Sequence, residues 1–428
     1  MLQSAMCQRW PKLGAWLVLI LAGGAALVWT ARAAGPATSP RRQIVLAVPA
    51  GGQRMMMLRQ VVDQFHRTCP EVEVKLRGIP GGKYYQKVLV MLASRTGPDV
   101  MWMGQSFSEF ADREVFLDLS PYIARDLNLA EYHPQAMGWY RYGDRQFGIP
   151  TGIDIRIMVY NEELFDEEGL DYPKNDWTFA EFLEKAKRLT KDRDGDGRID
   201  QYGYIGILEQ LLFDAQFIAD DGARATCNTP EMLDYLQTNV DLAEPYRVSP
   251  TPRQMQQTAG IDKYALFRQG RAAIMMMASW DLPALKKQCA DLRWDVVLNP
   301  QVRRQGQWAS SQSYTIWAQT PEPDACWELC KLLCGPSLQK QMAFAAIPTH
   351  LPTLAQAAAE HRGRPANVEA FVQATRMLDP TPRVPDLQEL QQLFHDACQS
   401  VFVGRADAAE AMDRAQRRID RAIRKESR

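Results

Sequence analysis

The feature that most constrains the fold is the order of two apolar runs and the helical pattern between them, just after residue 42. The run QIVLAVPAGG (43–52) is β-branched and ends in proline and glycine, which is typical of a buried strand followed by a loop. Apolar residues then recur at helical spacing over 55–67, and VEVKLRGIP (72–80) predicts a second strand. Strand, helix and strand in this order predict a right-handed crossover unit of a parallel sheet.

The same alternation continues along the chain. A helix is predicted over 84–95 and a strand in PDVMWMG (98–104). Because ligands of open α/β sheets collect at the carboxyl ends of strands, residues 51–53, including Gln53, and residues 102–106, including Trp102 and Ser106, are expected near a ligand site. With 428 residues the chain is too long for one small core, so two lobes are expected.

The second half of the chain carries similar local patterns. FGIPTG (147–152) predicts a strand broken by proline and glycine, and a separate strand is predicted over 155–160, near a change of lobe. Thr178 and Glu181 form a capping-box pattern that opens a helix. A turn at Gly270 precedes a predicted strand over 272–277, and helices are predicted from Asp386 to about Lys425.

Composition and motifs exclude several classes of protein. Lys plus Arg (50) nearly cancels Asp plus Glu (51), and the chain has no basic run that would follow phosphates, so nucleic acid is not expected as a partner. The phosphate-binding glycine motifs, the G-x-S-x-G elbow and the H-E-x-x-H motif are all absent from the sequence. The eleven tryptophans and fourteen tyrosines suit ligands with mixed apolar and hydroxyl faces.

The N-terminus has the three-part order of a secretory signal: Arg9 and Lys12, an apolar run over 14–29, and the small residues Ala31 and Ala33. Residues 1–33 are therefore predicted to be a signal peptide cleaved after Ala33, with an uncleaved membrane anchor as the alternative. Either way the protein is expected to be exported, periplasmic or at the cell surface, and soluble or N-terminally anchored.

Seven cysteines follow the predicted signal. Cys326, Cys330 and Cys334 share one helix face, where buried core residues are favoured over a soft-metal site because no fourth ligand follows. Whether Cys69 pairs with Cys227 or Cys289 stays open at this stage.

The stretch KDRDGDGRIDQYGY (191–204) fits the first nine positions of a calcium-binding loop. Its candidate ligands are Asp192, Asp194, Asp196, the carbonyl of Arg198, and Asp200. Position twelve is Gly203 where a bidentate Glu is normal, so weak Ca²⁺ binding and a solvated turn with carboxylates bonded to backbone amides are both open. No other cofactor is expected.

Polar and aromatic residues near predicted strand ends are the candidates for ligand binding. Asp154 and Glu209 are either ligand contacts or ordinary turn and helix-start carboxylates, and as a pair they raise the alternative of an exported carbohydrate-active enzyme. Trp102 and Tyr314 are further candidates for ligand contacts, although packing is the ordinary role of such rings, as it is for Trp308. Trp280 is the exception, because it follows an apolar strand where its ring can stack on a sugar.

Taken together, several segments resemble the extracellular solute-binding proteins of carbohydrate ABC importers, of the maltose-binding type. They run in the family's order from about residue 43 to 350: VVDQFHRTCPEVEVKL, YYQKVLVMLASRTGPDVMWMG, FLDLSPYI, FGIPTGIDIRIMVYNEELF, WTFAEFLEKAKRLT, ALFRQGRAAIMMMASWDLPAL and AAIPTH. The first strand lacks the aromatic residue common in the family, and Ala278 stands where a glycine is common.

The resemblance implies a two-lobed α/β periplasmic-binding-protein fold with a hinge between the lobes. It places residues 40–148 and about 300–350 in lobe 1, and 149–299 and about 351–428 in lobe 2. By motif it implies polar ligand contacts at Gln105, Ser106 and Asp154, a contact at Glu209, and a stacking aromatic at Trp280.

The resemblance also implies the function. We expect a non-enzymatic protein that binds a carbohydrate, an oligosaccharide or a sugar derivative, and delivers it to the permease subunits of an ABC importer. Besides the enzyme, a binder of a polyol phosphate or another small solute is an alternative, for which Lys83, Arg145 and Arg156 are candidates.

Overall fold

The computed structural model describes residues 42–104, 106–257, 262–378, 384 and 387–426. The predicted signal peptide or anchor, residues 1–33, lies outside the described residues, as does Gln105. Among the residues described, no helix is both long enough and apolar enough to cross a membrane.

The strands alternate with helices along most of the chain. The strands are β1 (Arg42–Pro49), β2 (Val72–Ile79), β3 (Val100–Met103), β4 (Arg141–Tyr142), β5 (Arg145–Gln146), β6 (Ile149–Asn161), β7 (Tyr202–Ile205), β8 (Ala272–Ala278), β9 (Trp294–Val297) and β10 (Ala309–Ile316). The α-helices are α2 (Gly52–Thr68), α3 (Tyr84–Ala93), α4 (Phe107–Asp112), α5 (Ser120–Asp126), α6 (Pro134–Gly138), α7 (Glu162–Glu167), α8 (Phe179–Leu189), α9 (Pro230–Ala243), α10 (Pro252–Gln257), α11 (Lys263–Arg268), α12 (Leu282–Gln288), α13 (Pro323–Leu333), α14 (Pro336–Gln341), α15 (Leu351–Glu360), α16 (Glu369–Ala374), α17 (Leu387–Phe402) and α18 (Ala408–Glu426). The short 3₁₀ helices are η1 (Gly81–Lys83), η2 (Leu129–Glu131), η3 (Gln210–Phe213) and η4 (Ser279–Asp281).

The sequence pattern predicted the first unit correctly. β1 pairs in parallel with β2 across helix α2, and also in parallel with β3. The capping box at Thr178 and Glu181 is present at the start of α8. The turn at Gly270 has φ +69°, a left-handed conformation that favours glycine, and it leads into β8.

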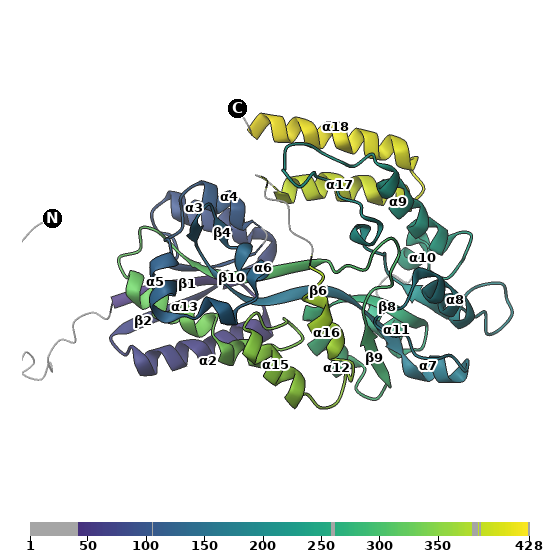
Figure 1. Cartoon of the computed structure of the whole chain (residues 1–428), viewed down its shortest axis with the longest axis horizontal. Helices are drawn as coiled ribbons and strands as arrows, with labels where there is room; N and C mark the ends of the chain where they lie inside the picture. The colour runs from purple at the N-terminus through teal and green to yellow at the C-terminus, as the bar shows by residue number, and fades with distance from the viewer. Residues whose placement is uncertain (1–41, 105, 258–261, 379–383, 385–386, 427–428) are drawn as a thin grey trace, which may run out of the picture.

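The strands of the two lobes are connected through one long strand. The sheet order is β2-β1-β3-β10-β6-β8-β7, and β9 also pairs with β6. The first part of β6 is antiparallel to β10, and its last part is antiparallel to β8 and β9. Figure 1 shows β1, β2 and α2 to α5 on one side, α7 to α11 on the other, and β6 running between them. The α/β fold is two-lobed, as predicted.

The predicted break within β6 is wrong. The segment forms one continuous strand, in which Pro150 is the second residue and pairs with Ser313. Gly152 is needed for packing, because a Cβ there would lie 2.8 Å from the Cβ of Ala346. The irregularity is a bulge: Ser313 lies opposite Pro150, and Gln312 lies opposite Gly152, so Thr151 is an extra residue on β6.

The core of the molecule forms on both faces of the sheet. On β6, Ile153, Ile155, Ile157 and Val159 pack into a cluster with residues of α11, α12, α15 and α16. Met158 and Tyr160, on the alternate face, pack into a cluster with residues of α8, α9, α17 and α18. Two further clusters fill the lobe that contains β1 to β3. The predicted boundaries of the lobes stay predictions.

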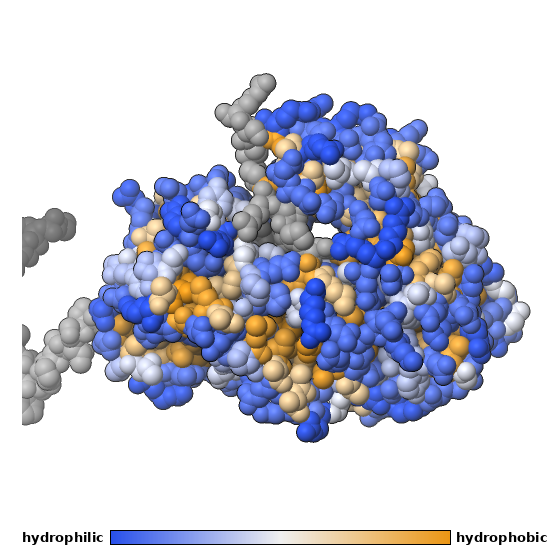
Figure 2. Space-filling model, viewed as in Figure 1, coloured by the Kyte–Doolittle hydropathy of each residue, from blue (hydrophilic) through white to orange (hydrophobic). Residues whose placement is uncertain are grey.

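The helices present apolar faces inward and charged faces outward. In α18, Met412, Ala415 and Ile419 are buried, whereas Arg414 and Arg421 are exposed. Figure 2 shows hydrophilic residues over α18 and apolar patches over α13 and α15. Cys326, Cys330 and Cys334 are buried core residues of lobe 1, as predicted, and all seven cysteines of the described chain are unpaired.

Helix α8 packs closely on strand β7 at Gly203, and this contact generates a prediction. A Cβ at this position of β7 would lie 1.9 Å from the carbonyl oxygen of Ala186 in α8. Gly203→Ala is therefore expected to lower the free energy of unfolding by about 3 kcal/mol, because backbone atoms must move to accept the methyl group. Urea unfolding followed by circular dichroism measures this loss.

Gly82→Ala is the matched control, since a Cβ there would meet nothing within 4 Å. An equal change in stability for the two variants would contradict the close packing of α8 on β7.

Candidate functional site

One cluster of polar side chains is built around Asp154 in the middle of β6. The side-chain Nε2 of Gln312, on β10, donates to Oδ2 of Asp154 at 2.8 Å. Oε1 of Gln312 accepts from Nε1 of Trp102 at 3.0 Å and from Arg54 at 3.3 Å. The Arg54 guanidinium also lies 5.5 Å from the centre of the Trp102 ring. The carboxyl ends of β1 and β3, which lead to Arg54 and Trp102, are therefore adjacent, as expected.

Asp154 is 3 % exposed, and its Oδ1 has no hydrogen-bond partner among the described residues. Burial raises the pKa of Asp154 to about 7, against the opposing effects of the Gln312 hydrogen bond and the Arg54 charge. A buried carboxylate oxygen without a donor is costly, so Oδ1 is a candidate acceptor for a donor outside the described residues.

The second cluster is built around Arg156, two residues along β6 from Asp154. Arg156 is the one residue of this strand that is not buried. Its guanidinium pairs with Glu209 at 2.7 Å and lies 4.6 Å from the centre of the Trp308 ring. The rings of Trp308 and Trp280 are 6.1 Å apart and nearly perpendicular, and Trp280 is 47 % exposed.

Local structure positions the side chains of both clusters. Because alternate residues of a strand face the same side, Asp154 and Arg156 project together from β6. The hydroxyl of Ser279 accepts from the backbone N–H of Ile155 at 3.1 Å, which ties the turn bearing Trp280 to the same strand. Glu209 comes just before η3, at the end of the loop that follows β7.

The structure brings four of the eight predicted ligand residues into these two clusters. Trp102 and Asp154 lie in the first, and Glu209 and Trp280 lie in the second. Ser106 is buried just before α4. The hydroxyl of the nearby Tyr85 accepts from the backbone N–H of Gly104 at 3.1 Å, and the Tyr85 ring is 6.0 Å from that of Trp102.

The remaining predicted ligand residues lie elsewhere or cannot be placed. Tyr314 is 5 % exposed in the lobe 1 core, opposite Trp102 on the neighbouring strand. Gln53 lies in the first turn of α2. Gln105 is outside the described residues. A ligand role for each predicted residue stays a prediction.

Sequence reasoning missed Arg54 and Gln312, and it assigned Trp308 to packing. Arg54 directly follows Gln53, which was predicted to lie near the ligand, so its place at the start of α2 could have indicated a role in the site. Gln312 gave no indication, because its role depends on contacts with residues far away in the sequence. Three cations were candidates for binding the phosphate group of a polyol phosphate, and the structure places them apart. Arg156 is paired with Glu209, Arg145 stacks over Phe147, and Lys83 is exposed in η1.

The acidic loop after α8 folds back on itself. Carboxylate oxygens of Asp192, Asp194 and Asp200 lie within 4.8 Å of one another, and Asp196 is not in this group. Asp192 accepts from the backbone N–H groups of Gly195 and Gly197 at 2.8 Å each. The turn with carboxylates bonded to backbone amides is therefore present, and three of the predicted Ca²⁺ ligands are grouped. A calcium ion in the loop stays a prediction.

Calorimetric titration tests the loop. If Ca²⁺ binds, its dissociation constant is expected at about 10⁻⁴ to 10⁻³ M, because only three carboxylates converge and the bidentate Glu is absent. Asp194→Ala is expected to abolish the heat. A wild-type protein that gives no heat with Ca²⁺ would end the prediction.

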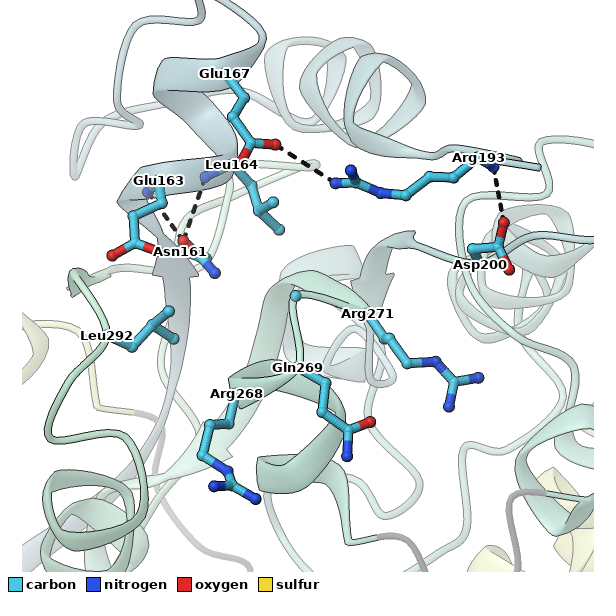
Figure 3. Close-up of a pocket in the computed structure, with 11 residues that line it drawn as sticks. Asn161, Glu163, Leu164, Glu167, Arg193, Asp200, Arg268, Gln269, Arg271 and Leu292 are labelled. Carbon is cyan, nitrogen blue, oxygen red and sulfur yellow. Dashed lines mark hydrogen bonds and ion pairs between the residues drawn. The ribbon is translucent and has the colours of Figure 1, made fainter. Parts of the chain in front are cut away.

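A separate pocket of about 460 Å³ lies in lobe 2, beside the acidic loop. Its lining includes Asn161, Glu167, Arg193, Arg268 and Arg271. Figure 3 shows Arg193 reaching toward Glu167, whereas the side chains of Arg268 and Arg271 diverge and do not meet Arg193 at a common point. This arrangement does not favour an anion site.

Comparison with known proteins finds one family and many similar structures. The family model described as "Bacterial extracellular solute-binding protein" matches residues 57–340, which is more than half of the chain. A galactooligosaccharide-binding protein of Bacillus subtilis is 21 % identical over 363 residues, which cover 81 % of this chain and 82 % of that protein.

Solved structures of similar fold cover nearly the whole chain. An ABC substrate-binding protein of Listeria monocytogenes in complex with cycloalternan has a TM-score of 0.77 and 19 % identity, over 90 % of this chain and 99 % of its own. The sugar-binding protein MalE of Xanthomonas citri has a TM-score of 0.76 and 20 % identity, over 90 % and 98 %. At these identities the structures support the fold alone.

Proposed function

The chain belongs to the bacterial extracellular solute-binding proteins, and we propose that it captures an oligosaccharide or a sugar derivative outside the cytoplasmic membrane and delivers it to an ABC importer. The family is exported, and its members act as binding components of transporters. The relatives named above that bind galactooligosaccharide and cycloalternan support a carbohydrate as the ligand class.

The observation that carries the proposal is the pairing of aromatic rings with buried polar groups along β6. Trp280 offers an exposed ring edge and face beside Trp308, and apolar sugar faces stack on such rings. Asp154 and the Arg156–Glu209 pair offer acceptors and donors for hydroxyl groups. Hinge closure of the two lobes would bring a bound sugar against both clusters.

The charges favour a neutral ligand over a polyol phosphate. The guanidinium of Arg156 is already neutralised by Glu209 at 2.7 Å, and Asp154 adds a carboxylate on the same face of β6. A phosphate there would meet two acids, whose charges the two nearby cations, Arg156 and Arg54, already offset, so its own negative charge would be left uncompensated.

We also propose that the protein is not an enzyme. A glycosidase needs one carboxyl group free to donate a proton and another free to attack or activate water. Glu209 is instead paired with Arg156, so of the two carboxyl groups only Asp154 keeps a buried oxygen without a partner among the described residues, and one group cannot fill both roles. Incubation of the mature protein with oligosaccharide mixtures is expected to give no cleavage products; cleavage that Asp154→Asn abolishes would overturn the binding-protein proposal.

A thermal-shift screen over sugars, polyols, polyol phosphates and amines tests the ligand class. An oligosaccharide is expected to raise the melting temperature most. Trp280→Ala is then expected to weaken its binding about tenfold, because loss of a stacked aromatic ring costs about 1.4 kcal/mol.

Tyr142→Ala is the matched control, since Tyr142 is a partly exposed aromatic residue on the β4–β5 hairpin. Equal binding by wild type and Trp280→Ala would remove Trp280 from the site, and stabilisation by a polyol phosphate alone would replace the sugar as the ligand.

A further inference from the structure

Gln312 is the residue through which the groups around Asp154 are connected. Its carboxamide oxygen faces two donors, Nε1 of Trp102 and the guanidinium of Arg54, so the amide can lie only one way round. Its nitrogen is then turned to Oδ2 of Asp154, at 2.8 Å. The backbone carbonyl of Gln312 accepts from Thr151 at 3.0 Å, in the bulge where β6 and β10 change register.

The arrangement leaves Oδ1 of Asp154 as a buried acceptor without a hydrogen-bond donor among the described residues. Two titratable groups from other elements lie near Asp154. Arg54, on α2, favours the ionised carboxylate, whereas the charge of Asp154 disfavours ionisation of the Tyr140 phenol, after α6. The Tyr140 hydroxyl donates to the carbonyl of Met103 at 3.2 Å and so is not the missing donor.

We propose that Gln312 is a positioning residue for ligand binding: it holds the Asp154 carboxylate ionised and turned so that Oδ1 accepts a hydrogen bond from a hydroxyl group of the bound sugar. The inference rests on the proposed function. The hydrogen bond from Gln312 stabilises the charged carboxylate against the cost of burial, and a hydroxyl donor from the ligand completes its coordination.

The sign of the pH dependence follows from this role. The ligand binds the ionised form, so affinity is full above the pKa of Asp154 in the free protein and falls as the pH drops through about 7. The fall is up to about tenfold per pH unit. If the protonated carboxyl instead donated to the ligand, affinity would rise as the pH drops.

The experiment compares wild type with Gln312→Met, which keeps the length of the side chain and removes both hydrogen-bonding groups. The best oligosaccharide from the thermal-shift screen is titrated by calorimetry from about pH 5 to about pH 9. Gln312→Met is expected to bind about tenfold more weakly at neutral pH, and the fall in affinity is expected to begin at higher pH, because the pKa of Asp154 rises without its donor.

Gln356→Met is the matched control, because Gln356 is exposed on α15 and its side chain donates to Glu360 on the same helix. A second measurement is the ¹³C NMR titration of the Asp154 carboxyl group in ligand-free protein, where Gln312→Met is expected to raise the pKa. The wild-type pH profile also serves as a test of its own if the variant does not fold.

The outcomes separate the two proposals. Sugar binding with a flat or inverted pH profile, or with the same profile in Gln312→Met, would overturn the role of Gln312 and leave the proposed function intact. No binding of any sugar at any pH would overturn the proposed function and, with it, this inference.

Discussion

The structure depends on the pairing of β6 with strands of both lobes. Its first residues form a ladder with β10, which continues to β3 and β1, and its last residues form ladders with β8 and β9. The backbone of β6 is bonded to β10 in its first part, where Ile153 also exchanges hydrogen bonds with Ile347, and to both β8 and β9 in its last part. Asp154 and Arg156 are therefore held on a backbone that is hydrogen-bonded to strands of both lobes.

In the candidate site, the acidic and basic side chains largely neutralise one another. Arg156 and Glu209 neutralise each other, and Arg54 faces Asp154 only through Gln312. Such a surface presents many directed hydrogen-bonding groups and little net field, which matches a neutral polyhydroxylated molecule better than an ion. The aromatic rings of Trp102, Trp280 and Trp308 add apolar area beside these groups.

Local patterns in the sequence predicted the first parallel unit, the capping box of α8, the strand after Gly270 and the two-lobed class. They failed at Pro150 and Gly152, which predicted a break in the strand. Pro150 is tolerated because it is near the start of β6, and Gly152 is required because it packs against Ala346. For the site, Trp280 followed from its place just after a strand, whereas Asp154 was selected beside a predicted strand break that is absent, and it lies within β6. Gln312 and Trp308 could not be found this way, because their partners are distant in sequence and only tertiary packing brings them together.

The bulge at Thr151 decides which face of β6 the site occupies. Ile149 lies opposite Tyr314 and Asp154 lies opposite Ser310, and directly paired residues point to the same side of a sheet. Asp154 is five positions after Ile149, an odd offset, so in a regular strand the two side chains would point to opposite sides. The single extra residue thus lets one strand bury Ile149 in the core of lobe 1 and still present Asp154 and Arg156 on the side of Gln312. One residue more or fewer before Asp154 would turn these side chains to the opposite face of the sheet.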